Sequence, residues 1–134
     1  MAVNSDKLTN GVFITFAGNC KKALTFYQTC FGGKLHFETF AQELQGYKEK
    51  PVISGSLIAD RIVIHGSDLV HNEGRKIGNY LSVFLPFKNA ADRMVLIDKL
   101  STSHKELPAT NDTDQKLVEI TDAFDVRWIL GIGD

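Results

Sequence analysis

The sequence lacks long hydrophobic runs and has no excess of charge of either sign. No apolar segment approaches the roughly 20 residues that a membrane-spanning helix needs. Residues 1–10 are mostly polar, so no targeting signal is expected either. Fifteen basic and sixteen acidic residues give a net charge of −1, which disfavours nucleic acid as a partner because that partner needs a basic surface.

Cysteine is also scarce, and two cysteines are too few for a disulfide scaffold. Cys20 and Cys30 fall on one expected helix, where ten residues of rise separate them by roughly 15 Å. A disulfide needs Cα atoms within about 7 Å, so we expect free thiols and a reducing cytoplasm. The helix start beside Lys21 and Lys22 predicts a lowered pKa for Cys20. No histidine is placed nearby as a base, which favours an incidental small residue over a nucleophile.

What the chain does contain is an ordinary globular composition. Its 134 residues are 43% hydrophobic and 23% charged, which predicts one domain over residues 1–134. The patterns within that length indicate a strand, a helix and three strands, and then much the same order again.

The first half is marked by clear local signals. Residues 11–16 are β-branched and aromatic, which favours a strand. Helical spacing of Ala23, Leu24, Tyr27 and Phe31 predicts a helix over Cys20–Phe31, with Asn19 as N-cap and Gly32 as the stop. Further strands are expected over the residue ranges 34–40, 52–58 and 61–65.

The second half follows a polar seam at residues 66–78. A strand is expected at 79–84 and a helix at 89–100, with an apolar face that comprises Ala90, Ala91, Met94, Ile97 and Leu100. A weak strand near 104–107 and two stronger strands at 116–121 and 126–130 complete it, with a turn at 122–125. The two halves are offset by about 67 residues in pattern rather than in identity.

These elements predict an α+β fold of two βαβββ modules, about 11–66 and 79–131, in one cupped mixed sheet. One helix per module covers only one sheet face. The uncovered faces would then form a cup for a small-molecule ligand. Because an open apolar concavity is usually closed by a partner, we expect a homodimer.

Two segments carry a resemblance to a known family. The string Gly-Asn-Cys-Lys-Lys-Ala-Leu-Thr-Phe-Tyr at 18–27, followed by Cys-Phe-Gly-Gly at 30–33, resembles the PhnB-like branch of the vicinal-oxygen-chelate superfamily. That superfamily includes glyoxalases, bleomycin-resistance proteins and extradiol dioxygenases. The closing Asp-Ala-Phe-Asp-Val-Arg-Trp at 122–128 is similar to the family's final turn and strand, with Asp125 where the family has glycine.

The resemblance implies a divalent metal held by two ligands from each module. Carried over, the first-module sites fall on Val12 and Ser54, and the second-module sites fall near Tyr80 or Leu81 and on Ile129. None of these is a good ligand, so we expect the metal site to be lost. The four histidines show no metal-binding spacing, and His65 is the best candidate among them for the rim of the cup.

The residues expected to line the ligand site are therefore not metal ligands. Arg127 lies two residues before Ile129, so on a strand it shares the face of the lost ligand and offers a guanidinium for a carboxylate or phosphate. A solvated Arg127 is the alternative, with Asp68 or Glu119 as acidic neighbours. The remaining candidates are Ser54, Ser56, His65, Phe16 and Phe37, and the two aromatic residues have plain core packing as their alternative.

Three functions remain open at this point. The first is a metal-free small-molecule binder in the manner of the bleomycin-resistance branch, without a cofactor. The second is a metal-dependent lyase, isomerase or dioxygenase with a displaced metal site, and the third is a non-catalytic interaction module. A nucleotide-type cofactor, and methyltransferase chemistry with it, is disfavoured because no glycine-rich loop joins a strand to a helix.

Overall fold

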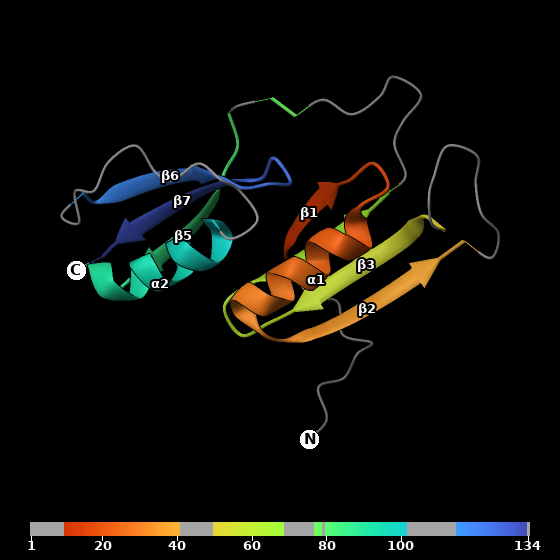
Figure 1. Ribbon diagram of the computed structural model, residues 1–134, viewed down its shortest axis with the longest axis horizontal. Helices are drawn as coiled ribbons and strands as arrows, with labels where there is room; N and C mark the ends of the chain where they lie inside the picture. Colours follow the sequence, from red (N-terminus) through yellow and green to blue (C-terminus); the bar gives the residue numbers. More distant parts are fainter. Residues whose placement is uncertain (1–9, 41–49, 69–76, 79, 102–114, 134) are drawn as a thin grey trace. The chain divides into compact units, whose positions relative to one another are not determined.

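The computed structural model describes residues 10–40, 50–68, 77–78, 80–101 and 115–133. The chain divides into two compact units, Met1–Arg75 and Lys76–Asp134. Each unit consists of one helix packed on one sheet (Figure 1).

The first unit has the element order that the sequence predicts. Its elements are β1 (Val12–Thr15), α1 (Cys20–Phe31), β2 (Lys34–Thr39), β3 (Val52–Ile58) and β4 (Val63–Ser67). The sheet order is β1-β4-β3-β2, in which β1 runs parallel to β4 and the other neighbours are antiparallel. This confirms a βαβββ module with a mixed sheet, and α1 and β3 have the expected bounds.

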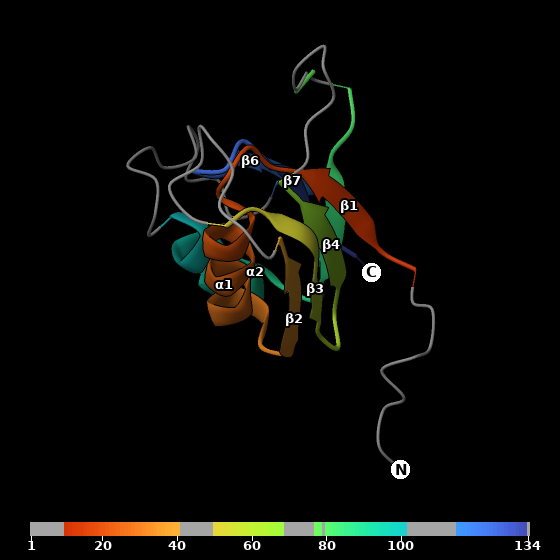
Figure 2. The same ribbon diagram turned by 90° about the vertical axis from the view of Figure 1, so that its right-hand side faces the viewer.

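Helix α1 covers one face of this sheet (Figure 2). Gly55 and Gly66 lie on the covered face, since a Cβ at Gly55 would be 3.0 Å from Leu24 Cδ1 and one at Gly66 would be 3.1 Å from Cys20 Sγ. The missing side chains let the helix approach the strands closely. Among the described residues of this unit, no helix or strand packs on the opposite face, which we call the open face of the first sheet.

The second unit repeats this arrangement with fewer described strands. It comprises β5 (Val83–Phe87), α2 (Ala90–Ser101), β6 (Leu117–Thr121) and β7 (Arg127–Ile132). The sheet order is β5-β7-β6, with β5 parallel and β6 antiparallel to β7. The weak strand expected near 104–107 lies outside the described residues. The α+β class is confirmed in both units.

The predicted position of the strand before α2 was wrong by several residues. β5 begins at Val83, and Tyr80 and Leu81 are 87% and 74% exposed. The reason is the pairing with β7, because Val83–Phe87 aligns one to one with Trp128–Ile132. Pro86 is tolerated within β5 because this strand lies at the edge of the sheet.

The predicted buried face of α2 was also partly wrong. The buried residues are Arg93, Leu96, Ile97 and Leu100, and Met94 is 41% exposed. Both helices have 12 residues and begin at Cys20 and Ala90, so they are offset by 70 residues rather than 67. Burial of Arg93 is compensated by hydrogen bonds from its Nη1 to the carbonyl oxygens of Gln115 (2.7 Å) and Leu130 (3.3 Å).

No helix among the described residues has the length and apolar character needed to cross a membrane.

Candidate functional site

A row of polar side chains crosses the open face of the first sheet. His36 of β2 is the register partner of Ser56 in β3, and Ser56 is the partner of His65 in β4. Phe13 of β1 extends the row beyond His65. Because register partners point to the same side of a sheet, and Gly55 next to Ser56 faces α1, all four side chains lie on the open face.

Two members of this row are joined by a hydrogen bond. Ser56 Oγ and His65 Nδ1 are 2.9 Å apart, and the tautomer of His65 decides which group donates. The pair fixes the orientation of the imidazole ring. It therefore presents a hydroxyl and a ring nitrogen at a defined spacing, which suits recognition of a ligand's polar groups.

Ser54 lies on the same face, one step along β3. It is exposed and pairs in register with Glu38 of β2. The structure thus brings together three of the expected site residues, Ser54, Ser56 and His65. Sequence reasoning missed His36, although strand alternation would have placed it opposite the face of Leu35 and Phe37.

The two expected aromatic site residues lie on the other side of the sheet. Phe16 is fully buried, and its Cε2 is the atom that a Cβ at Gly66 would meet at 3.0 Å. The Phe37 ring similarly approaches Gly55 on the face that α1 covers. Phe16 belongs to the core of the first unit, whereas Phe37 is half-buried on that face, away from Ser56 and His65.

Arg127 lies in the second unit, on the sheet face away from α2. Its neighbour Trp128 is fully buried on the helix side, so Arg127 points the opposite way. The Arg127 Nε donates to Glu119 Oε2 at 2.8 Å, and its Nη2 forms an ion pair with the same oxygen. Of the two acidic neighbours expected, Glu119 is the partner, and its carboxylate already neutralises the guanidinium.

Asp68 has a different task, which the sequence did not indicate. Its Oδ1 accepts hydrogen bonds from the backbone N–H groups of Gly18 (2.8 Å) and Cys20 (2.9 Å), and its Oδ2 accepts one from Val52 (2.9 Å). Asn19 occupies the N-cap position of α1 but makes no side-chain capping hydrogen bond. The expected local cap is therefore replaced by a buried carboxylate from the end of β4.

The expectation for Cys20 was wrong in direction. Burial raises the pKa of the Cys20 thiol to about 12, and the negative charge of Asp68 adds to the effect. Cys20 is therefore a buried neutral thiol and not a nucleophile.

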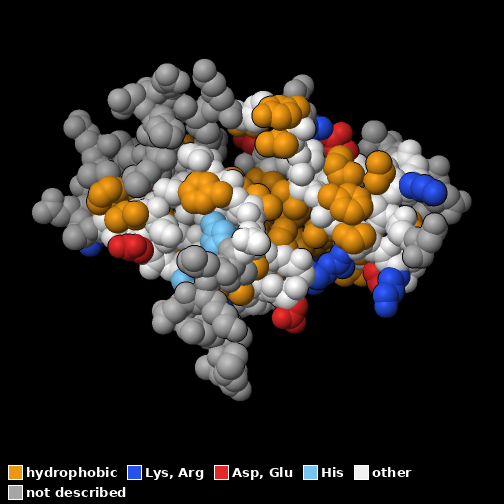
Figure 3. Space-filling view, turned by 180° about the vertical axis from the view of Figure 1, so that it is seen from behind, with side chains coloured by type: hydrophobic (Ala, Val, Ile, Leu, Met, Phe, Trp, Pro, Cys, Tyr) orange, Lys and Arg blue, Asp and Glu red, His pale blue; other side chains and the backbone are white. Residues whose placement is uncertain are grey.

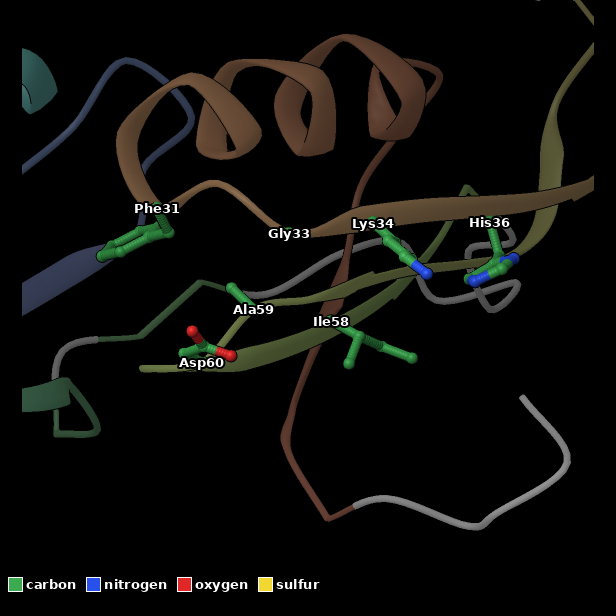
Figure 4. A pocket seen from close by; sticks show the side chains of 7 residues that line it. All are labelled: Phe31, Gly33, Lys34, His36, Ile58, Ala59 and Asp60. Carbon is green, nitrogen blue, oxygen red and sulfur yellow. The ribbon is translucent and has the colours of Figure 1, made fainter. Parts of the chain in front are cut away.

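A pocket of about 310 Å³ opens beside the polar row, at the end of the sheet where β2 begins (Figure 4). Its lining residues are Phe31, Gly33, Lys34, His36, Ile58, Ala59 and Asp60. Lys34 and His36 are alternate residues of β2, and their side chains project from the same side of that strand (Figure 4). His36 thus belongs to both the row and the pocket.

The positions implied for a metal are not arranged to hold one within the first unit. Val12 pairs with Ile64, which is 1% exposed on the α1 side, whereas Ser54 is on the open face. The two positions therefore face opposite sides of the sheet. Across the described ranges, no group of three or more His, Cys, Asp or Glu side chains is close enough to bind a metal ion.

Solved structures share this architecture over nearly the whole chain. Protein PA1353 from Pseudomonas aeruginosa has a TM-score of 0.70 at 20% identity, covering 94% of this chain and 98% of its own. The PhnB protein from Bacillus cereus has a TM-score of 0.67 at 17% identity, with coverages of 94% and 100%. A member of the glyoxalase/bleomycin resistance protein/dioxygenase superfamily from Sphaerobacter thermophilus has a TM-score of 0.53 at 15% identity, with coverages of 94% and 98%.

At these identities the likeness shows the fold alone. No family model matches the sequence, and no curated protein matches it either. The chain shares its α+β fold with these proteins, one of which is a member of the glyoxalase/bleomycin resistance protein/dioxygenase superfamily. Fold does not determine activity, so function has to be argued from the site.

Proposed function

We propose that this chain is a small-molecule-binding protein that has lost the superfamily metal site, and that its ligand contacts the open face of the first sheet. The row His36–Ser56–His65 carries the proposal. Three polar side chains on adjacent strands, two of them joined at 2.9 Å, form a defined set of donors and acceptors. A face that served only for apolar packing would not use them, because burial of polar groups without partners is costly.

The surroundings of the row also suit a ligand. Phe13, at the end of the row, is 63% exposed and offers apolar surface beside the polar groups. Figure 3 views this side of the first sheet and shows histidine side chains next to hydrophobic ones. Apolar surface beside a few convergent polar groups is a feature of small-molecule sites.

A fragment screen by protein NMR tests this proposal. We expect the screen to find ligands that shift the amide signals of residues 54–56 and 65. The Ser56→Ala and His65→Ala variants should each bind these ligands at least fivefold more weakly. Thr121→Ala, an exposed change in the second unit, serves as control. A diverse library that leaves the open face unperturbed contradicts the proposal.

Arg127 remains a candidate ligand anchor, although Glu119 competes for it. If a ligand displaces Glu119 from Arg127, the Arg127→Met variant no longer binds that ligand and loses little stability. If Arg127 only pairs with Glu119, the same variant binds the ligand unchanged.

A metal-dependent lyase, isomerase or dioxygenase is the second candidate. One observation favours it: His36 and His65 flank Ser56 on the same face, and imidazole is a common zinc ligand. We expect added zinc, nickel or manganese to leave the melting temperature unchanged, since a metal bound to the native state must raise it. A rise that His65→Ala removes would favour the enzyme.

A homodimer is part of the proposed small-molecule function, and a surface that would form it also fits the third candidate, a non-catalytic interaction module. Phe84 and Leu117 are 57% and 59% exposed on the face of the second sheet away from α2. Both side chains approach Gly131, whose missing Cβ leaves room for them. We expect a dimer that buries these side chains. Light scattering that gives only the 14.9 kDa monomer at high concentration contradicts the dimer.

The expected compartment is part of the same proposal. Cys20 and Cys30 are both buried thiols outside any disulfide, which is consistent with a reducing cytoplasm. The balanced charge continues to disfavour nucleic acid as a partner.

A further inference from the structure

We infer that the pocket at the start of β2 binds the carboxylate group of a monoanionic ligand with an apolar body. This inference rests on the proposed small-molecule function and assigns the chemical class of the ligand. It identifies Lys34 and His36, rather than Arg127, as the anion-binding groups.

The strand register brings the cationic and hydrogen-bonding groups together. Lys34 pairs with Ile58, and His36 pairs with Ser56. Both side chains project from the same side of β2 into the pocket (Figure 4). An ammonium and an imidazole N–H two residues apart on one strand offer two donors to a single carboxylate.

The distribution of charges favours Lys34 over Arg127 of the second sheet as the group that binds an anion. Arg127 already forms an ion pair with Glu119. Lys34 is exposed, and within the described part of the chain no carboxylate lies close enough to form an ion pair with it. An anion at Lys34 therefore need not displace an internal carboxylate first.

The rest of the lining defines the body of the ligand. Phe31, Ile58 and Ala59 supply apolar surface, and about 310 Å³ lies at the lower end of the range of roughly 300–1,000 Å³ for ligand pockets. Glycine is required at Gly33, in the turn from α1 to β2. Its φ is +97°, and a Cβ there would clash with the Ile58 carbonyl oxygen. The backbone turn from α1 thus approaches the end of β3 closely.

Asp60 limits the charge of the ligand. Its carboxylate lines the same pocket, on the turn that follows Ile58. Asp60 repels any negative charge in the pocket, and this repulsion is about twice as large for a dianion as for a monoanion that binds at Lys34. The pocket therefore favours a monocarboxylate over a phosphate dianion of similar size.

Titration of the ¹⁵N-labelled full chain with matched probes tests the inference. The probes are 3-phenylpropionate, the cationic isostere 3-phenylpropylamine, and phenyl phosphate. We expect 3-phenylpropionate to shift the amides of residues 33–36 and 58–60 and to bind at least fivefold more tightly than the other two. The Lys34→Met variant should bind 3-phenylpropionate about fivefold more weakly, as expected for the loss of one exposed charge pair. The change His36→Ala should lower the affinity further. Lys22→Met, on the exposed side of α1, should change nothing.

The outcomes separate this inference from the proposed function. Equal binding of the amine, tighter binding of phenyl phosphate, or no response of residues 33–36 to 3-phenylpropionate overturns the inference. Binding of other fragments at Ser56 and His65 would still support the proposed function. Since Lys34 and His36 are exposed, an unchanged spectrum elsewhere establishes that both variants are folded.

Discussion

The carboxylate of Asp68 accepts a hydrogen bond of 2.9 Å from the backbone N–H of Cys20, 48 residues earlier in the chain. The same side chain binds the N–H of Val52 at the start of β3, so one residue joins the beginning of α1 to the sheet. The second helix is capped locally instead, because Asn89 Oδ1 accepts from the Asp92 N–H at 2.8 Å. The two units thus use different means to satisfy the same orphan N–H groups.

Removing the Asp68 charge should destabilise the protein strongly. Asp68 is 2% exposed, and Asp68→Asn replaces one of two accepting oxygens with a donor that faces backbone N–H groups. We expect a loss of about 3 kcal/mol in the free energy of unfolding, measured by urea denaturation. Asp60→Asn, an exposed change, should cost less than about 0.5 kcal/mol. Equal losses for the two variants would contradict the role assigned to Asp68.

The turn between β6 and β7 contains one residue with a strained backbone conformation, which a substitution by glycine can relieve. Asp125 has φ = +66° and is the one non-glycine residue with positive φ among those described. The left-handed conformation costs an L-residue about 1–2 kcal/mol, and glycine avoids it at some entropic cost. Asp125→Gly should therefore raise the free energy of unfolding by about 0.5 kcal/mol, detectable as a higher melting temperature. Asp60→Gly, at a position without positive φ, should lower it.

The buried thiol predicts a loss of stability at alkaline pH. Cys20 has a pKa of about 12 in the folded chain against an ordinary value of 9.0. Between these values the unfolded chain releases the thiol proton while the folded chain retains it. Stability therefore falls as pH rises from 9 towards 12, by about 1.4 kcal/mol per pH unit for this group. Urea denaturation from pH 8 to 11 should show a shallower fall for Cys20→Ala. Identical slopes would mean that the thiol is not desolvated as described.

The pair Arg127–Glu119 should contribute little to stability. The two side chains are 23% and 48% exposed, and exposed pairs are worth about 0.2–1 kcal/mol. A double-mutant cycle with Arg127→Met and Glu119→Gln should give a coupling in that range that decreases in 1 M salt. A coupling above about 2 kcal/mol, insensitive to salt, would show that the pair is structurally essential.

Local signals in the sequence were sufficient for much of the first unit. Helix α1 matches its prediction because the apolar spacing and the glycine stop are encoded within the helix itself, and the Gly32 N–H binds the Gln28 carbonyl oxygen at 2.8 Å. The start of β5 and the buried face of α2 were not predicted correctly. They depend on β7 and on the carbonyl of Leu130, 37 residues from Arg93.

For the candidate site, the sequence by itself determined the residue types and the strands, and it identified Ser54, Ser56 and His65 as candidates. Only the tertiary structure decided which side chains share a face: it added His36 to Ser56 and His65 and placed Phe37 on the face that α1 covers. The physical reason is the two-residue period of a strand, in which a shift by one residue reverses every side chain. That choice is made by pairing between strands and by the helix that covers one face, and neither is encoded within a single strand.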